Sequence, residues 1–175
     1  RTCLSKRLYD VIKKDMRLAL VAIGIPGAGK STHLRPFAAE HGFAYVSKDD
    51  LREEILGDTT NQSRNKEIWE EANRRIAAAL SDGRGVVIDG TNAEAWKRKE
   101  AIHFLRESGA THVIGVYADI PLELAKEQNQ MRERVVPEEA LEWMHQQLTK
   151  EPPSLEEGFD ALISPGELDE FGKTL

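Results

Sequence analysis

The hydrophobic positions of this chain fall into short apolar runs that are separated by longer stretches with helical spacing. Runs of strand length, bounded by polar or glycine-containing turns, lie at residues 18–23, 43–47, 85–89, 112–118 and 161–163. Short continuous apolar runs are typical of strands that are buried on both faces of a parallel sheet. The chain therefore predicts a central parallel sheet of about five strands.

The stretches between these runs carry apolar residues three and four positions apart, which is the spacing of one face of a helix. They predict helices at residues 31–40, 50–56, 65–80, 93–107, 119–131 and from Pro137 to about Thr149. Strands that alternate with helices favour an α/β fold in which helices cover both faces of the sheet. We expect Trp69, Trp96 and Trp143 to be core or partly buried anchors.

Directly after the first apolar run, residues 24–31 read G-I-P-G-A-G-K-S, which matches the phosphate-binding P-loop. The glycines let the backbone amides turn toward a triphosphate, and the following helix N-terminus adds oriented donors. Lys30 provides a positive charge for the β- and γ-phosphates, and the Ser31 hydroxyl is placed to bind Mg²⁺. We expect ATP and Mg²⁺ to bind here, with nucleotide contacts from Gly24, Pro26, Gly27, Ala28, Gly29, Lys30, Ser31 and Thr32.

Other candidate residues follow the second and third strands, at the edge where ligands bind in open α/β sheets. Asp49 and Asp50 are two candidates for the carboxylate that accepts the proton of an acceptor hydroxyl. Asp50 and Glu53 form a capping-box pattern, so we assign Asp50 to the helix N-cap and Asp49, outside the helix, to the catalytic base. The alternative is that both are only turn and cap residues.

Arg52, one turn into the same predicted helix, is a candidate for binding an acceptor phosphate through two hydrogen bonds, with a surface arginine as the alternative. Asp89 ends the third strand at the Walker B position, where a carboxylate holds Mg²⁺ directly or through water. Thr91 and Asn92 follow at the same edge and are candidates for contacting the acceptor. Thr91 and Glu94 also fit a capping box that simply starts a helix.

A basic loop between two predicted helices contains Arg132 and Arg134. In P-loop kinases, a lid of this kind supplies an arginine that neutralises charge on the transferring phosphoryl group. We place this lid at about residues 125–137 and count both arginines as candidate nucleotide contacts. A solvated charge run is the alternative, because Glu133 lies between them. The basic cluster at 97–99 is interpreted as a solvated helix face.

Composition indicates the class of protein but not its chemistry. The chain has 175 residues, of which 40% are hydrophobic and 31% charged, as is ordinary for one soluble globular domain. It lacks a membrane-spanning apolar run and the pattern of a secretory signal, so we expect a cytoplasmic protein. A single cysteine, Cys3, excludes an internal disulfide and a cysteine-based zinc site.

The net charge of −6 is unevenly placed along the chain. Residues 151–175 contain seven acidic residues and one basic residue, whereas residues 1–150 contain 23 of each sign. The acidic balance argues against a broad non-specific nucleic-acid surface, but only weakly against a polyanionic substrate. We expect a helical extension at 1–17, a P-loop kinase domain at 18–164 and an acidic tail at 165–175.

Five motifs, taken together, resemble a known family. They are G-x-P-G-A-G-K-S-T, S-K-D-D-L-R, V-I-D-G-T-N, R-x-R-V-V-P-E-E and E-P-P-S-L-E-E-G-F-D. The set covers about residues 18–160 and resembles the polynucleotide 5′-hydroxyl kinase-like family of P-loop kinases, which includes the kinase module of polynucleotide kinase–phosphatases. The resemblance implies an adenylate-kinase-like P-loop NTPase fold and transfer of the γ-phosphate of ATP to a 5′-hydroxyl of RNA or DNA.

The resemblance also implies roles for single residues. Asp49 matches the general base, Arg52 the arginine that binds the neighbouring phosphate of the acceptor, and Arg132 the lid arginine, with Arg134 as the alternative. The lysine and serine of the P-loop match the residues that hold the triphosphate and Mg²⁺. Asp89 lies one position before the aspartate of some members, which makes its match to a metal ligand less direct.

Two other functions stay open from the sequence. The neutral charge balance of residues 1–150 also suits a kinase for a small molecule such as a sugar, an antibiotic or a nucleoside. A nucleotide-dependent regulatory module would bind ATP and would need neither Asp49 nor Arg52. The D-x-D-x-T phosphatase motif of the bifunctional enzymes does not occur in these 175 residues.

Overall fold

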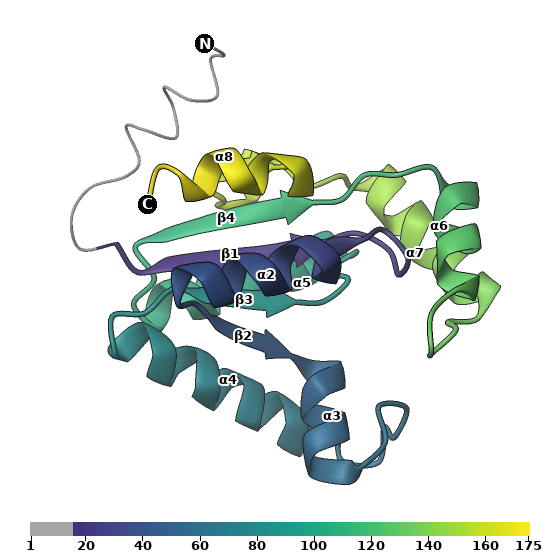
Figure 1. The fold of residues 1–175 in the computed structure, drawn as a ribbon, viewed down its shortest axis with the longest axis horizontal. Coiled ribbons are helices and arrows are strands. Elements are labelled where there is room, and N and C mark those ends of the chain that lie inside the picture. Colours follow the sequence, from purple (N-terminus) through teal and green to yellow (C-terminus); the bar gives the residue numbers. More distant parts are fainter. Residues whose placement is uncertain (1–15) are drawn as a thin grey trace.

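Five parallel strands form one sheet in the computed structural model, which describes residues 16–175 (Figure 1). The strands are β1 (Leu18–Ile23), β2 (Ala44–Ser47), β3 (Val86–Asp89), β4 (His112–Tyr117) and β5 (Ala161–Ile163). Their order in the sheet is β2-β3-β1-β4-β5. The prediction of a parallel sheet of about five strands is confirmed.

The central strand, β1, is apolar and buried at all six positions. β3 and β4 pair with it on either side, so that Val21 lies opposite Ile88 and Gly115. β2 pairs with β3 and places Ser47 opposite Asp89. The carboxyl ends of β1, β2 and β3 therefore meet at one edge of the sheet, which brings the P-loop beside the residues that follow Ser47 and Asp89.

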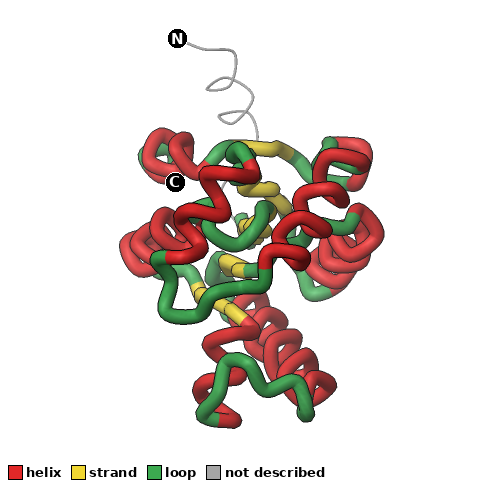
Figure 2. Tube along the Cα trace, turned by 90° about the vertical axis from the view of Figure 1, so that its right-hand side faces the viewer, coloured by secondary structure: helices red, strands yellow, loops and turns green. Residues whose placement is uncertain are grey.

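Helices cover both faces of the sheet, as the turned view in Figure 2 shows. They are α2 (Lys30–His41), α3 (Lys48–Leu56), α4 (Asn65–Ser81), α5 (Ala95–Glu107), α6 (Leu122–Gln130), α7 (Glu138–Lys150) and α8 (Leu168–Gly172), with short 3₁₀ turns at Leu155–Glu157 and Pro165–Glu167. Buried side chains of α2 and α8 pack on one face, and those of α4, α5 and α7 pack on the other. This arrangement is the expected α/β P-loop fold.

The C-terminal residues pack on the domain and do not form a separate acidic tail. α8 buries Leu168 and Phe171 against α2, where the ring centroids of Phe171 and Phe37 lie 6.1 Å apart. Asp169 and Glu170 stay exposed, so the many charges of this segment hid the spacing of its two apolar residues in the sequence. The domain thus continues past residue 164, where we expected it to end.

The expected helical extension at 1–17 lies almost wholly outside the described residues. Within residues 16–175, no helix is both long enough and apolar enough to cross a membrane. The other helices and strands lie within a few residues of their expected positions. For example, the last strand, expected around residues 161–163, is β5.

Candidate active site

The P-loop joins β1 to α2 at the carboxyl edge of the sheet (Figure 1). Gly24 has a φ of +142° and Gly27 a φ of +87°, conformations that side chains with a Cβ rarely adopt. A Cβ on Gly27 would lie 2.4 Å from the carbonyl oxygen of Ala125 in α6. The loop therefore runs directly against α6, and a larger residue at Gly27 would displace one of the two segments.

Lys30 is the first residue of α2, and its side chain is buried. The ammonium group donates a hydrogen bond to the Ile25 carbonyl at 2.9 Å, inside the P-loop. Burial lowers the pKa of Lys30 to about 8, an effect that the charge of Asp89 opposes and that of Arg132 reinforces. A phosphate group bound in the loop would compensate for this loss of hydration of the ammonium group.

Asp89, the last residue of β3, accepts two hydroxyl hydrogen bonds on the same oxygen. Ser31 Oγ donates to Asp89 Oδ2 at 2.6 Å, and the Tyr45 hydroxyl on β2 donates to the same atom. The predicted magnesium ligands, Ser31 and Asp89, are thus in contact. Within the described residues, no group of three or more histidine, cysteine or acidic side chains is arranged to hold a metal ion.

The side chains of Ser31 and Asp89 are nevertheless suitable ligands for Mg²⁺. This ion prefers oxygen ligands, retains several water molecules and is often bound by one or two protein groups together with substrate phosphates. A hydroxyl and a carboxylate beside a P-loop provide that set of donors. Ser31 and Asp89 would therefore be the residues that hold Mg²⁺ when a nucleotide is bound.

Tyr45 is a site residue that the sequence reasoning missed. Side chains alternate along a strand, so Tyr45 shares a face of β2 with Ser47, and this was the available signal. Burial and the Asp89 carboxylate raise the pKa of the Tyr45 hydroxyl, so it stays protonated and donates. The guanidinium of Arg35 lies 4.4 Å from the centre of the Tyr45 ring and pairs with Asp50 at 2.7 Å. These contacts hold the ring in place.

Asp49 lies in the first turn of α3. We had expected it to lie before the start of the helix. α3 begins at Lys48, and the Ser47 hydroxyl accepts a hydrogen bond from the Asp50 amide at 3.3 Å. Ser47 is therefore the N-cap, and the assignment of that role to Asp50 was wrong. Because β2 runs directly into the helix, the Asp49 carboxylate still lies at the carboxyl edge of the sheet, where half of it is exposed.

Two arginines from distant parts of the chain donate to the same oxygen of Asp49. Arg52 Nη1 lies 2.8 Å and Arg134 Nη1 lies 3.1 Å from Asp49 Oδ1. Arg134 also donates to the Thr59 carbonyl at 3.1 Å. Arg52 is buried and donates from Nη2 to Asn65 at 3.2 Å, but its Nε has no partner among the described residues.

The loop between α6 and α7 carries both predicted lid arginines, and a buried asparagine joins its two ends. Asn129 is 1% exposed, and its side chain donates to the Val136 carbonyl at 2.8 Å and accepts from the Val136 amide at 3.1 Å. Arg132 lies close enough to the P-loop for its charge to lower the pKa of the P-loop lysine. Arg134 instead reaches α3, so the two arginines contact different parts of the site.

The loop after β3 is hydrogen-bonded to β1 and the P-loop. The Gly24 amide donates to the Thr91 carbonyl at 3.0 Å, and Asn92 Nδ2 donates to the Ala22 carbonyl at 2.7 Å. The capping box that we considered at Thr91 does not form, because α5 begins at Ala95. Thr91 and Asn92 thus support the P-loop backbone, and their contact with an acceptor stays a prediction.

Arg98, which we placed on a solvated helix face, is fully buried. Its guanidinium pairs with Glu157 through contacts of 2.5 and 2.6 Å and donates to the carbonyls of Asn92, Ala93 and Glu151. The interpretation as a solvated residue was wrong, because a local charge run gives no sign of a partner 59 positions away. Arg98 joins the loop after β3 to the segment that follows α7.

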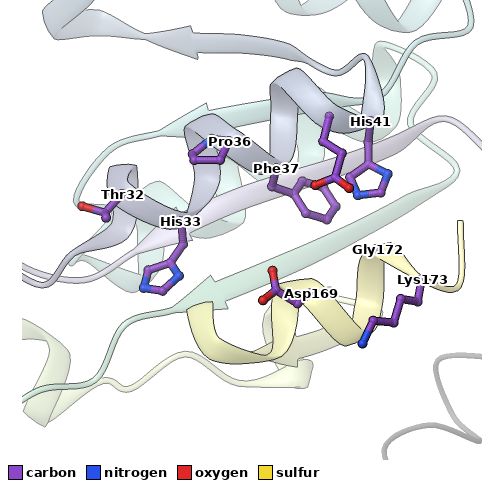
Figure 3. A pocket seen from close by; sticks show the side chains of 9 residues that line it. Thr32, His33, Pro36, Phe37, His41, Asp169, Gly172 and Lys173 are labelled. Carbon is purple, nitrogen blue, oxygen red and sulfur yellow. The ribbon is translucent and has the colours of Figure 1, made fainter.

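A separate hollow of about 510 Å³ lies between α2 and α8 (Figure 3). Pro36 and Phe37 line it from α2, and Asp169 and Lys173 line it from the C-terminal segment. Among the predicted site residues, Thr32 alone belongs to this lining. The hollow is therefore distinct from the edge at which the predicted phosphate-binding and acceptor residues meet.

The P-loop, the contact between Ser31 and Asp89, and the contact between Asp49 and Arg52 lie at one edge of a parallel sheet, and together they define a P-loop kinase. The chain belongs to the AAA domain family, whose sequence model matches residues 20–152. Membership of this family implies that the P-loop binds a nucleotide. The expectation of a P-loop kinase domain related to polynucleotide kinases is confirmed by this match together with the relatives below.

One relative is the protein named "Putative bifunctional polynucleotide phosphatase/kinase" from Acanthamoeba polyphaga mimivirus. It is 30% identical over 122 residues, which are 69% of this chain and 24% of the relative. The chain thus spans about a quarter of that relative's length.

Two solved structures extend the comparison. A chain in the structure of the Pnkp1/Rnl/Hen1 RNA repair complex is 25% identical, with a TM-score of 0.69 over 79% of this chain and 46% of that chain. A gluconokinase from Sinorhizobium meliloti 1021 is 16% identical, with a TM-score of 0.57 over 92% of this chain and 90% of that chain. The likeness to the gluconokinase shows the fold alone.

Proposed function

We propose that this domain transfers the γ-phosphate of ATP to the 5′-hydroxyl end of RNA or DNA. The observation that carries the proposal is the arrangement at Asp49, whose Oδ1 accepts hydrogen bonds from both Arg52 and Arg134. Within the described residues Asp49 Oδ2 has no hydrogen-bond partner, so it is free to accept the proton of an acceptor hydroxyl. The relationship to polynucleotide phosphatase/kinase supports this choice of acceptor.

Arg52 is the residue that would recognise a nucleic-acid end. A strand with a free 5′-hydroxyl carries its first phosphate on the same nucleotide, close to the hydroxyl that reacts. Arg52 lies beside Asp49, and its buried Nε lacks a partner among the described residues. A phosphate group beside Asp49 would pair with the Arg52 guanidinium through charge-assisted hydrogen bonds, whereas a neutral sugar would provide weaker ones.

The reaction forms a bond between the acceptor oxygen and the γ-phosphorus and breaks the bond between that phosphorus and the bridging oxygen of ATP. Asp49 takes the proton of the acceptor hydroxyl, and ADP leaves with the electron pair of the broken bond. Lys30 and Arg132 place positive charge beside the β- and γ-phosphates. Mg²⁺ held by Ser31 and Asp89 would supply further neutralisation of the triphosphate charge.

The experiment that tests this function follows γ-labelled phosphate from ATP to a short oligonucleotide with a 5′-hydroxyl, with RNA and DNA in parallel and Mg²⁺ present. We expect the oligonucleotide to become labelled, with kcat/KM at least about tenfold lower for Arg52→Ala, since a charged hydrogen bond contributes about 1.5–3 kcal/mol. Arg84→Ala, at an exposed arginine, is the matched control. An unlabelled oligonucleotide, with ATP binding retained, would contradict the proposal.

A second candidate function is a kinase for a small hydroxyl compound. One observation favours it: the charge of residues 1–150 sums to zero, which suits a small uncharged acceptor. A screen of sugars and nucleosides with labelled ATP distinguishes the candidates. A phosphorylated small molecule, with activity that Arg52→Ala retains, would favour this second function over a nucleic-acid acceptor.

A further inference from the structure

Three tryptophans of this chain are far more exposed than we expected. Trp69, Trp96 and Trp143 are 47%, 58% and 46% exposed, although most tryptophan side chains in folded proteins are largely buried. Trp69 is on α4 and Trp96 on α5, whereas Trp143 is on α7. The first two lie near the acceptor side of the proposed active site.

Trp69 and Trp96 lie on helices that follow two adjacent strands, β2 and β3. β2 leads into α3, and Arg52 of α3 donates to Asn65, the first residue of α4, one turn before Trp69. β3 leads into α5, whose second residue is Trp96. Both α4 and α5 cover the same face of the sheet and begin at its carboxyl edge. Both indoles are therefore near the start of helices that begin at the same edge as the residues that would hold the acceptor.

A lysine accompanies each of these indoles. Lys48 Nζ lies 2.9 Å from the centre of the Trp69 ring, and Lys97 Nζ lies 5.2 Å from the centre of the Trp96 ring. Burial, together with the charges of Arg52 and Lys97, lowers the pKa of Lys48 to about 7. The three cations are thus near enough to repel one another, and a bound anion would relieve that repulsion.

Acidic residues also border these lysines and give the surface a mixed character. Glu94 pairs with Lys97 and accepts a hydrogen bond from Trp96 Nε1 at 3.0 Å, so it fixes the edge of the indole and leaves the ring exposed. Asp49 and Glu100 partly offset the effect of the cations on Lys48. The charge is therefore moderate, and the exposed aromatic area is the dominant feature.

We propose that Lys48, Trp69, Trp96 and Lys97, named here the indole surface, bind the unpaired bases and the phosphates of a single-stranded polynucleotide acceptor behind its 5′ end. The proposal rests on the proposed function. Exposed aromatic rings stack on bases of any sequence while cations contact the backbone, and this combination is typical of single-strand binding. Arg52 contacts both Asp49 and α4, so a strand whose 5′-hydroxyl faces Asp49 continues over the indole surface.

This arrangement predicts a preference among nucleic-acid ends. Bases reach an indole face only when they are unpaired and unstacked from their neighbours. A single strand or a 5′ overhang therefore binds the indole surface, whereas the bases of a blunt duplex do not. The contribution of the indole surface to binding grows with the length of the acceptor. A nucleoside 3′-monophosphate has only the hydroxyl and the phosphate that would contact Asp49 and Arg52, and it has no further bases to stack on the indoles.

The first experiment measures binding without catalysis. Fluorescence anisotropy of labelled eight-nucleotide single strands gives the Kd for the wild type, for Trp96→Ala and for Trp69→Ala/Trp96→Ala. We expect the Kd to rise about tenfold or more, since stacking on one indole contributes about 1–3 kcal/mol per base. Trp143→Ala, at an equally exposed tryptophan on α7, is the matched control and keeps the wild-type Kd. Thermal melts identify any variant that fails to fold, in which case Trp96→Ala alone is compared.

The second experiment compares kinetics for the eight-nucleotide strand and for a nucleoside 3′-monophosphate. We expect the tryptophan variants to raise KM for the strand by a larger factor than KM for the monophosphate, with kcat nearly unchanged. Equal KM values for variant and wild type on the strand would overturn the indole surface and leave the proposed function standing. Tryptophan-dependent binding without phosphorylation would instead support the indole surface and contradict the proposed function.

Two further outcomes would overturn the indole surface. One is a wild type that binds no single strand in the anisotropy assay. The other is a wild-type dimer that becomes monomeric in Trp69→Ala/Trp96→Ala, because the tryptophans would then form an interface between protein chains. Analytical ultracentrifugation of both proteins measures this second outcome.

Discussion

Arg134, in the loop before α7, donates a hydrogen bond to Asp49 in α3 at 3.1 Å, although 85 positions separate the two residues. Arg52 donates to the same carboxylate oxygen at 2.8 Å. The carboxylate is thus held between α3 and the loop that joins α6 to α7, which we predict to be the lid. A base that is held in position before the acceptor binds needs little rearrangement at the moment of reaction.

The first prediction concerns Asp49→Asn, which keeps the shape of the side chain but cannot accept a proton. We expect kcat to fall at least about 100-fold, since a general base contributes roughly that factor or more. Calorimetric titration with ATP is expected to give a Kd close to that of the wild type, because Asp49 lies outside the P-loop. The measurement is steady-state kinetics of phosphoryl transfer together with this titration.

Asp50→Asn is the matched control for this prediction. Asp50 is the neighbouring carboxylate, but it pairs with Arg35 at 2.7 Å and so faces α2. We expect its kcat to stay much closer to that of the wild type. An equal loss of kcat and of ATP binding in a folded Asp49→Asn protein would exclude the role of general base. An unchanged kcat of phosphoryl transfer in Asp49→Asn would also exclude this role, because the reaction would then not depend on the Asp49 carboxylate.

A second prediction separates the two lid arginines. The charge of Arg132 reaches the P-loop lysine, so Arg132→Ala is expected to weaken ATP binding and to lower kcat. Arg134 contacts Asp49 and Thr59 instead, so Arg134→Ala is expected to lower kcat by roughly tenfold, with an unchanged Kd for ATP. Kinetics and nucleotide titration of both variants test the difference. The reverse pattern would exchange the two roles.

The features that could be predicted from the sequence are those that local patterns specify. Residues 24–31 contain the whole P-loop, and the six apolar residues before it specify the central strand. The apolar run at residues 85–89 likewise predicted a strand that ends at Asp89. In each case the residues that determine the structure lie within about ten positions of one another.

The features that were missed depend on partners that lie far away in the sequence. Arg98 is buried only because Glu157, 59 positions later, compensates its charge. Tyr45 belongs to the site only because the register of β2 and β3 brings Asp89, 44 positions later, within reach. The predicted start of α3 was wrong for a different reason. Ser47 and Asp50 are both suitable N-cap residues, and because β2 leads directly into the helix, Ser47 takes that position.

A third prediction concerns the buried pair of Arg98 and Glu157. Arg98→Met leaves the Glu157 carboxylate buried without its partner, and we expect a loss of about 3–5 kcal/mol in the free energy of unfolding. Arg98→Met/Glu157→Gln is expected to recover part of that loss, because the remaining group is uncharged. Urea unfolding of the three proteins measures both values.

The control for this pair is Arg106→Met. Arg106 pairs with Asp160 at 2.6 Å, but both side chains are about one third exposed, so solvent screens the interaction. We expect Arg106→Met to cost clearly less than Arg98→Met. Similar losses for the two variants would mean that burial of the Arg98 pair adds little to the stability of the fold.

The last prediction follows from the Lys48 ammonium group. Its pKa is about 7 in the folded chain, below the ordinary value of 10.5, because burial, Arg52 and Lys97 disfavour the charged form. Between about pH 7 and pH 10 the unfolded chain therefore binds more protons than the folded chain. The charged Lys48 lowers the free energy of unfolding at pH 6, and this loss is recovered as the pH rises. Lys48→Met removes this dependence.

Between pH 6 and pH 9, the free energy of unfolding of the wild type is therefore expected to rise relative to that of Lys48→Met by about 1–3 kcal/mol, at 1.36 kcal/mol per pH unit. Urea unfolding at both pH values measures this difference. Lys66→Met, at an exposed lysine on α4, is the control. A constant difference for Lys48→Met would mean that contact with the Trp69 ring stabilises the ammonium group enough to offset its burial.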